Sequence, residues 1–368
     1  MTLNSLLLNA KDVATVVERI GRDSVMDGLI DRLTRTIRGL HSQKFQAPER
    51  AGFSYEEPEW GLLEWMPAYF QNDGTTVKLV GYHPGNPEAR NLPSVLSTIC
   101  VFDTSSGGLK GLVDGTLLTA LRTGAASAVA SRVLGHPDST TLGIFGCGAQ
   151  SVTQAQALSR VFPIERILAY DIDPHTAATA SERLSFIGRP VELFSTAERE
   201  RMLERCDILC TCTSAEPGTG PVLPEFDPRD HLHINAVGSD FAEKLEVPVD
   251  LLRKSLVCPD FRGQAMVEGE CQQLSEEEIG PDFCELLENE ERYHSHRSSL
   301  TVFDSTGWAV EDHVAASFIL ELARECGVGQ DVSLDNIAPD PKDPYSMLGN
   351  PTAASPASGS RVAVVTTS

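Results

Sequence analysis

The chain has 368 residues, of which 41% are hydrophobic and 22% charged, a composition typical of a globular protein. This length exceeds what one hydrophobic core usually serves, so we predict two domains. Asp and Glu outnumber Lys and Arg by 52 to 30, which gives a net charge of −22. Such acidity argues against a nucleic-acid or anionic-membrane partner. It suits a cationic substrate, or it serves solubility alone.

No apolar stretch reaches the roughly 20 residues that cross a bilayer, and no signal peptide is recognised, so a soluble protein is expected. The nine cysteines form no CxxC pair, and we expect reduced thiols in a cytoplasmic protein. Two histidine pairs have no acidic or thiol partners at a ligand spacing, so no metal is predicted. These pairs are His231 with His233 and His294 with His296.

The first hundred residues divide into a helical and a β-rich part. Apolar residues at three- and four-residue spacing over 13–33 predict amphipathic helices. Between 62 and 102, β-rich segments separated by Gly, Pro and Asn predict antiparallel hairpins. Glu64 and Lys78 interrupt these segments. They either face water or, with Arg50, form an amino-acid site in which Arg50 and Lys78 bind the carboxylate and Glu64 the ammonium group.

A long helix is predicted over 115–134, where many small residues allow two backbones to pack closely. Arg122 interrupts the apolar side of this helix. One interpretation is a solvated position. The other is a phosphate or carboxylate contact, since the helix directly precedes a nucleotide-binding pattern.

That pattern is TTLGIFGCGAQ at 140–150, which predicts a buried strand, a glycine turn and a helix. Gly146 allows a tight turn, Gly148 allows close approach to a pyrophosphate, and the helix start favours an anion. A second strand, 166–170, ends at Asp171, the position of a carboxylate that holds a ribose diol. An acid there repels a 2′-phosphate, so the sequence predicts NAD rather than NADP. A tight turn without a ligand is the alternative.

Further apolar segments at 207–213, 231–237, 256–260 and 300–303 predict the remaining strands of a parallel sheet. Asp240 follows a glycine at the carboxyl end of one of them and is expected to face the crevice as a catalytic acid and base. A plain turn or helix-cap aspartate is the alternative. Lys244 lies one helical turn further on and is placed to tune it.

The polar stretch 268–297 is interpreted as surface helices. After 306, apolar residues at four-residue intervals up to Gly327 predict a helix that folds back onto the first domain. The tail 350–368 is rich in Ala, Ser, Thr and Pro and is expected to be disordered.

With these motifs in place, the chain resembles the ornithine cyclodeaminase and mu-crystallin family. The likeness lies in LLTALRTGAASAVASRVL, GIFGCGAQSVTQAQAL, HINAVGSD and VFDSTG. Within the family it is most similar to the lysine cyclodeaminases, through EWMP, HLHINAVG, EGECQQLS and DPYS. These motifs extend from Arg50 to Ser346, about four fifths of the chain.

The resemblance implies a homodimer of α/β class. A Rossmann-type NAD-binding domain, 126–310, would be inserted into an α+β substrate-binding and dimerisation domain made of 1–125 and 311–349. It implies that Asp240 is the catalytic acid. The substrate site implied comprises Arg50, Glu64, Lys78 and Arg122. The cofactor contacts implied are Thr98, Arg122, Gly146, Gly148, Ala149, Gln150, Asp171, Lys244 and Ser305.

The implied reaction is the cyclising deamination of L-lysine to L-pipecolate, in which NAD accepts a hydride from Cα and returns it, and ammonia is released. Three alternatives stay open. The first alternative is an enzyme that converts L-ornithine to L-proline; it stays open because one methylene is worth only about 1 to 3 kcal/mol of discrimination. The second alternative is a one-way NAD(P)-dependent amino-acid dehydrogenase or imine reductase. The third is a protein that binds a cofactor without catalysis.

Overall fold

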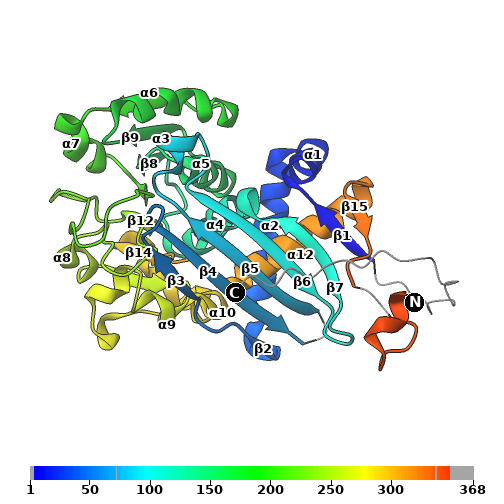
Figure 1. The fold of residues 1–368 in the computed structure, drawn as a ribbon. Helices are drawn as coiled ribbons and strands as arrows, with labels where there is room; N and C mark the ends of the chain where they lie inside the picture. The colour runs from blue at the N-terminus through cyan, green and yellow to red at the C-terminus, as the bar shows by residue number, and fades with distance from the viewer. Residues whose placement is uncertain (1–3, 72, 336–337, 349–368) are drawn as a thin grey trace, which may run out of the picture.

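A computed structural model of the chain describes residues 4–71, 73–335 and 338–348. Two sheets lie side by side, and helices pack between and around them (Figure 1). The predicted disordered tail, 350–368, lies outside the described residues. Among the described residues, no helix is both long and apolar enough to span a bilayer.

One sheet is mixed and has the order β15-β1-β7-β6-β5-β4-β2, with β3 also paired to β4. From β4 to β7 it runs as antiparallel neighbours, as the hairpin pattern predicts. Its strands are β1 (Ser5–Leu8), β2 (Phe45–Gln46), β3 (Ala51–Tyr55), β4 (Gly61–Phe70), β5 (Gly74–Tyr82), β6 (Val95–Phe102), β7 (Leu109–Asp114) and β15 (Gln330–Val332).

The other sheet is parallel throughout, with the order β10-β9-β8-β11-β12-β14-β13. The order reverses between β8 and β11, and such a switch point is where doubly wound sheets bind ligands. Its strands are β8 (Thr141–Phe145), β9 (Arg166–Tyr170), β10 (Val191–Phe194), β11 (Ile208–Thr211), β12 (His233–Ala236), β13 (Leu256–Pro259) and β14 (Thr301–Asp304). This arrangement confirms the predicted Rossmann-type architecture.

Three long helices, α2, α4 and α12, lie behind the mixed sheet in the view of Figure 1, and in the described part of the chain no helix packs on the opposite face. The helices are α1 (Ala10–Ile20), α2 (Arg22–Arg38), α3 (Asn86–Arg90), α4 (Thr116–Leu134), α5 (Ala149–Val161), α6 (Pro174–Arg183), α7 (Arg199–Leu203), α8 (Val249–Leu252), α9 (Arg262–Ala265), α10 (Phe283–Glu288), α11 (Glu290–Tyr293) and α12 (Ala309–Cys326).

The small residues of α4 bring it close to α5, the helix that follows the glycine turn. A Cβ atom on Gly124 of α4 would lie 2.5 Å from the backbone oxygen of Thr153 in α5, so only glycine fits there. Helix α12 contacts α4 and the strands β4, β5 and β6, and its residues Val310 and Val314 are buried. The prediction that this helix folds back onto the first part of the chain is confirmed.

Two sequence interpretations are wrong. Strands β1, β2, β3, β7, β10 and β15 were not predicted; β1, β2, β10 and β15 have four residues or fewer, and the residues of β3 are mostly exposed and show no alternating pattern. The stretch 268–297 is not a set of surface helices. Phe283 and Leu286 of α10 are fully buried, and Glu270 is buried as well, because this segment packs against α2, α4 and β13. The many charged residues of this stretch made its apolar face hard to recognise in the sequence.

The predicted domain boundaries at 125/126 and 310/311 fall inside α4 and α12, so both junctions between the two sheets are continuous helices. The boundaries themselves remain a prediction.

Candidate active site

A cavity of about 140 Å³ lies where the mixed sheet meets the carboxyl ends of the parallel strands. It brings together eight of the predicted site residues, which come from five separate parts of the chain. They are Arg50, Glu64, Lys78, Arg122, Gln150, Asp240, Lys244 and Ser305. Apolar walls come from Leu62, Met66, Val80, Val95, Val237 and Phe241, with Tyr82 beside them. A few charged groups within an apolar pocket are typical of a small-molecule site.

Strand alternation explains why Glu64 and Lys78 point inward. Side chains alternate between the two faces of a strand, and Lys78 lies opposite Met66 in the β4–β5 ladder. Glu64, Met66 and Lys78 therefore share the face that helix α12 covers. Glu64 is 9% exposed and Lys78 only 1%. The interpretation that these charges face water is wrong for both.

Lys78 and Arg122 converge on one carboxylate of α12. The Nζ of Lys78 lies 2.7 Å from Oδ2 of Asp312, and the Nε of Arg122 donates to Oδ1 of the same residue at 3.1 Å. Arg122 also donates from Nη1 to Glu311 at 2.7 Å. All four side chains are buried. The alternative of a solvated Arg122 is excluded.

Burial dominates the electrostatics of this cluster. It lowers the pKa of Lys78 to about 8, although the neighbouring Asp312 carboxylate acts in the opposite direction. Burial raises the pKa of Glu311 to about 8, against the pull of Arg122. At neutral pH, Lys78 is then mainly charged and Glu311 mainly protonated. The cluster keeps one positive charge in excess, which suits a substrate carboxylate.

The guanidinium of Arg122 packs against the backbone after β14. A Cβ atom on Gly307 would lie 2.7 Å from both terminal nitrogens of Arg122, and Gly307 has φ of +89°, which glycine adopts without strain. Arg50 reaches the same segment from the loop before β3 and donates to the carbonyl oxygens of Thr306 and Gly307. The turn after β14 thus holds two of the three predicted carboxylate-binding cations.

Arg50 also carries two acidic neighbours. Its Nη1 lies 3.5 Å from Glu64, and its Nε lies 3.1 Å from Glu268. Burial raises the pKa of Glu268 to about 7; Arg50 opposes this, while the nearby carboxylates of Glu64 and Asp240 reinforce it. Burial likewise raises the pKa of Glu64. A carboxyl group with a pKa near 7 gives and takes protons readily at neutral pH.

Asp240 occupies the loop after β12, and its side chain is 45% exposed. Its Oδ1 accepts a hydrogen bond from the Nζ of Lys244 at 2.9 Å. Burial by itself would lower the pKa of Lys244, but Asp240 and Tyr82 outweigh it, so the pKa is raised. The Lys244 ammonium group also lies 4.8 Å from the centre of the Tyr82 ring. The predicted pairing of Lys244 with Asp240 is present.

Hydrogen bonds to Glu246 anchor the loop that carries Asp240. This buried carboxylate accepts hydrogen bonds from the Thr211 hydroxyl at 2.6 Å, from the Thr213 amide at 2.8 Å and from the Gly238 amide at 2.7 Å. Glu270 in turn accepts from the backbone amide of Glu246 at 2.7 Å. The ends of β11 and β12 are tied together two residues before Asp240.

The glycine turn after β8 lies at the switch point of the parallel sheet. Gly146 has φ of +98°, and a Cβ atom there would lie 2.7 Å from the backbone oxygen of Cys212 after β11. In contrast, a Cβ atom on Gly148 would meet nothing within 4 Å. Helix α5 begins at Ala149 without a side-chain cap, which leaves its first amides available for an anion. The turn therefore fits a pyrophosphate.

Asp171 completes this end of the cofactor site. It follows β9, and its Oδ2 accepts a hydrogen bond from the backbone amide of Cys147 at 2.7 Å. Ser305, at the inner end, has a buried hydroxyl without a hydrogen-bond partner among the described residues. The geometry suits a dinucleotide that extends from Asp171 along the glycine turn toward the cavity.

Comparison with known proteins agrees with this geometry. The model of the ornithine cyclodeaminase/mu-crystallin family matches residues 10–327. The chain belongs to this family.

Within the family, the chain is 40% identical to L-lysine cyclodeaminase of Streptomyces rapamycinicus over 346 residues, which cover 94% of this chain and all of the relative. A solved lysine cyclodeaminase, studied for its recognition of L-lysine, L-ornithine and L-2,4-diaminobutyric acid, has a TM-score of 0.90 and 44% identity, and the match covers 94% of this chain and 99% of the other. An archaeal alanine dehydrogenase dimer with bound NAD has a TM-score of 0.79 and 28% identity, covering 90% and 100%.

One residue implied by the family likeness lies elsewhere. Thr98 is exposed on β6, while its neighbours Ser97 and Ile99 are buried on the cavity side. Thr98 pairs with Leu79, which faces the same outer surface. Because side chains alternate along a strand, a shift by one residue reverses the face. This placement does not support a contact between Thr98 and the nicotinamide within one copy of the chain.

Three acidic residues of the site were missed: Glu268, Glu311 and Asp312. The pair at 311–312 stands among apolar residues at the start of α12, and two adjacent acids in a buried helix are unusual enough to have been a signal. Glu268 is the first residue of EGECQQLS, one of the motifs that carry the family likeness, but its place in a strongly acidic stretch led to its interpretation as a surface acid. Among the described residues, no group of three or more His, Cys, Asp or Glu side chains converges as metal ligands would.

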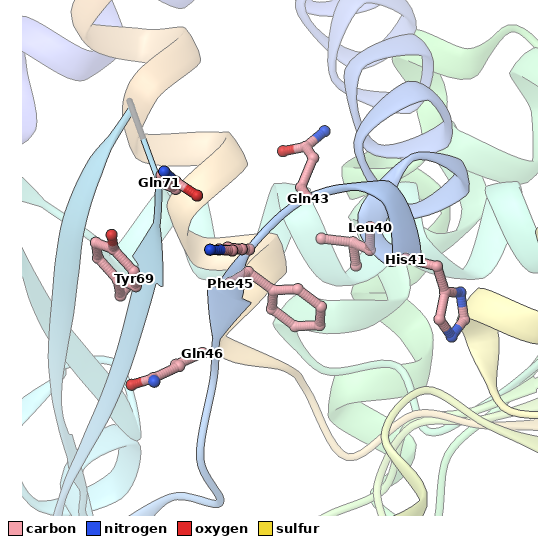
Figure 2. Close-up of a pocket in the computed structure, with 8 residues that line it drawn as sticks. Leu40, His41, Gln43, Phe45, Gln46, Tyr69 and Gln71 are labelled. Carbon is pink, nitrogen blue, oxygen red and sulfur yellow. The ribbon is translucent and has the colours of Figure 1, made fainter.

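A second hollow lies at the edge of the mixed sheet beside β2 (Figure 2). It is an open groove of about 570 Å³. Its lining is mostly amide, aromatic and aliphatic: Leu40, His41, Gln43, Lys44, Phe45, Gln46, Tyr69 and Gln71. His41 lies 2.6 Å from Glu288. The groove is larger than the inner cavity, but its lining includes none of the predicted site residues.

Proposed function

We propose that the protein converts L-lysine to L-pipecolate by cyclising deamination, with release of ammonia and with NAD as an internally recycled hydride carrier. The observation that carries the proposal is the inner cavity. Its lining has four cations, Arg50, Lys78, Arg122 and Lys244, and two carboxyl groups, Glu64 and Asp240, beside the cofactor turn of a Rossmann-type sheet. A diamino acid carries one carboxylate and two ammonium groups, and this cavity offers a partner to each.

Arg50, Lys78 and Arg122 bind the substrate carboxylate in this proposal. Lys78 and Arg122 are fixed by Asp312, and Arg50 is fixed by the carbonyl oxygens of the turn after β14. Bound between cations that cannot swing away, the carboxylate holds Cα in place, which supplies the orientation that the reaction needs. Glu64 and Asp240 line the same cavity and receive the ammonium groups, and Glu268 lies next to Arg50.

Gly146, Gly148, Ala149 and Gln150 hold the pyrophosphate of NAD, Asp171 holds the ribose, and Ser305 and Lys244 lie toward the nicotinamide end. Asp171 selects against NADP because a carboxylate repels a 2′-phosphate. When bound, NAD supplies a hydride acceptor that also gives the hydride back, so it ends each turnover unchanged.

Asp240 moves protons at its carboxylate, and Lys244 holds it in place. Glu268, whose pKa burial brings to about 7, is a second proton carrier next to Arg50. Once Cα is oxidised, the terminal amine of the same substrate molecule attacks it. Ring closure is favoured because both reactants belong to one molecule. Protonation of the departing α-amino group then releases ammonia.

The proposal is tested by incubation of the purified protein with NAD and L-lysine, followed by mass analysis of the products and an ammonia assay. The expected result is L-pipecolate and ammonia in equal amounts, with no lasting change in NADH absorbance. L-lysine labelled with deuterium at Cα should give pipecolate that keeps the label. Loss of the label to free NADH would contradict a recycled hydride.

L-ornithine is the second candidate substrate, with L-proline as product. The solved lysine cyclodeaminase that resembles this chain at 44% identity was studied with both diamino acids. Parallel assays at equal concentration give the ratio of kcat/KM for the two. A ratio near one would make the chain a general diamino-acid cyclodeaminase.

A one-way dehydrogenase is the third candidate, because an alanine dehydrogenase shares the fold at a TM-score of 0.79. Such an enzyme accumulates NADH in proportion to product. The test is incubation with NAD and L-alanine, or with NADH, pyruvate and ammonia. A dehydrogenase changes the absorbance at 340 nm continuously, whereas a cyclodeaminase leaves it steady.

We also propose that the chain forms a homodimer through the helix-free face of the mixed sheet. Phe53, Trp65, Leu79 and Leu96 expose apolar side chains on this face, each more than a third accessible. A large exposed apolar patch marks an interaction surface, and the alanine dehydrogenase relative is a dimer. Analytical ultracentrifugation of the protein and of Leu79→Glu tests this, since a charge at the centre of the face should shift it to monomer.

The nine cysteines are free thiols in the structure, which suits a reducing compartment, and we place the protein in the cytoplasm. L-pipecolate is not one of the standard amino acids, so we assign the enzyme to secondary metabolism. Fractionation of producing cells with an antibody against the protein tests the location.

A further inference from the structure

Lys78 and Arg122 come from different elements, β5 and α4, yet they are held at a fixed separation by one carboxylate. Asp312 uses its two oxygens separately, with Oδ2 at 2.7 Å from Lys78 and Oδ1 at 3.1 Å from Arg122. Asp312 is 1% exposed and lies in the first turn of α12. A carboxylate that bridges two cations fixes both the distance between them and the direction in which their remaining N–H groups point.

We propose that Asp312 is a positioning residue for the proposed reaction: it holds Lys78 and Arg122 as a preformed pair that grips the substrate carboxylate between them. The inference rests on the proposed function and extends it to a residue that need not touch the substrate. Without Asp312, two buried cations would repel each other, and each long side chain would be free to turn away.

The charge count supports this role. Lys78 and Arg122 contribute two positive charges, and Asp312 contributes one negative charge. Glu311 is the other acid of the cluster. One of its oxygens accepts a hydrogen bond from Arg122, and burial raises its pKa to about 8, so it is mainly protonated at pH 7. Among these four groups, the substrate carboxylate then supplies the second negative charge. Asp260 is a further buried acid that acts on Arg122 and Glu311, and burial raises its pKa.

The charged groups around Lys78 define the expected pH dependence. Burial lowers its pKa to about 8; Asp312 raises it, and Arg122 and Arg50 lower it further. Glu64 faces it from β4. As the pH rises through 8, Lys78 loses its proton, and KM for the diamino acid should rise. If the negative charge of Asp312 is removed, the pKa of Lys78 falls, and the rise in KM should begin at lower pH.

The test is Asp312→Asn, which keeps the size of the side chain and removes its charge. We expect KM for L-lysine to increase roughly tenfold or more at pH 7, and the alkaline rise in KM to move down by about one pH unit. The same profile measured in Glu311→Gln removes the titration of Glu311, whose pKa is also about 8, so that the limb remaining near pH 8 belongs to Lys78, while Glu268, with a pKa of about 7, titrates at lower pH.

Asp207→Asn is the matched control. Asp207 is also a buried aspartate, paired with Arg229 and close to His231, but it lies just before β11, at the opposite end of the parallel sheet. The Asp207→Asn variant should lose thermal stability without a change in KM or in the pH profile of KM. An Asp312→Asn variant that behaves like Asp207→Asn, with lower stability and an unchanged KM profile, would overturn the proposal.

If Asp312→Asn does not fold, Asp312→Glu decides the question. Glutamate keeps the charge but moves the carboxylate by one methylene, so KM should rise while the alkaline limb stays near its original pH. An unchanged KM in a folded Asp312→Glu would refute the positioning role. The wild-type assay separates the two proposals: no ammonia from any diamino acid refutes the function, whereas an active wild type with an indifferent Asp312 refutes only the positioning role.

Discussion

The two ends of the cavity differ in rigidity. At the carboxylate-binding end, Lys78, Arg122 and Asp312 are buried, and each ionic group has a partner from another element. At the proton-transfer end, Asp240 is half exposed on a loop and has one partner, Lys244. In the proposed reaction, the first end holds the substrate carboxylate still, and the second exchanges protons with substrate and water. A reaction with two hydride transfers at one carbon needs both, since the carbon must stay fixed while protons come and go.

The strongest test of this contrast is Asp240→Asn. We expect the variant to fold, because a half-exposed loop side chain adds little to stability, and to lose roughly 10² to 10⁴ in kcat, the usual value of an acid or base. Rate measurements with L-lysine, beside a thermal melt, check both points. Near-normal turnover in a folded variant would transfer the proton-carrying role to Glu268 and end the assignment of Asp240.

Lys78→Met should raise KM, whereas Asp240→Asn lowers kcat. Loss of a charged hydrogen bond to the substrate carboxylate costs about 1.5 to 3 kcal/mol, or roughly a 10- to 100-fold rise in KM. Methionine has a similar shape and suits a buried position, so the fold should persist. A comparison of KM and kcat for this variant and for Asp240→Asn shows whether the two ends act separately. A fall in kcat alone would mean that Lys78 is part of the proton-transfer end.

The buried end should also govern the pH dependence of stability. Burial raises the pKa of Glu311 to about 8 and that of Asp304 to about 7, well above the values of an unfolded chain. A raised folded-state pKa of an acid stabilises the protein at low pH, and this stability is lost as the pH rises through the folded pKa. For Glu311 the loss between pH 6 and 9 is about 2 to 3 kcal/mol.

Thermal melts at pH 6 and pH 9 measure this directly, and the melting temperature should be lower at pH 9. Glu311→Gln remains neutral at both values, so the difference between its two melting temperatures should be smaller than that of the wild type. An equal difference in both proteins would show that Glu311 is ionised throughout this range.

The smallest effect is expected at Thr98. Its side chain points to the helix-free face, away from the cavity, so Thr98→Ala should change kcat and KM by less than about twofold. Ser97 is the matched comparison, because its buried hydroxyl lies 3.2 Å from the hydroxyl of Thr119 on the cavity side. A larger loss of activity in Thr98→Ala than in Ser97→Ala would mean that the outer face contributes to an active site. That result is expected if Thr98 reaches the site of a partner subunit packed on this face.

Much of the site was visible in the sequence because local rules identify it. The glycine turn, Asp171 and Asp240 each follow a short apolar strand, and the carboxyl ends of parallel strands meet at one edge. Lys78 and Glu64 were recognisable as charges inside apolar strands. Thr98 was implied by the family likeness alone; in one copy of the chain its side chain lies on the outer face, because neighbouring residues of a strand face opposite sides.

The acidic half of the site was not accessible in this way. Asp312 is 190 positions from Arg122 along the chain, and only the return of α12 across the mixed sheet brings the two together. Glu268 looked like one of many surface acids until its stretch was seen to pack against the core. A pKa of about 7 or 8 for a carboxyl group depends on burial, and burial depends on contacts between distant segments.

The sequence by itself determined the parallel sheet, the cofactor turn and the basic residues of the cavity, because these follow from periodicity, glycine geometry and charge in an apolar setting. Only the tertiary structure decided which acid faces which base, because ion pairs join side chains that are distant along the chain. It also decided which acids keep their protons, because desolvation is a property of the packed molecule.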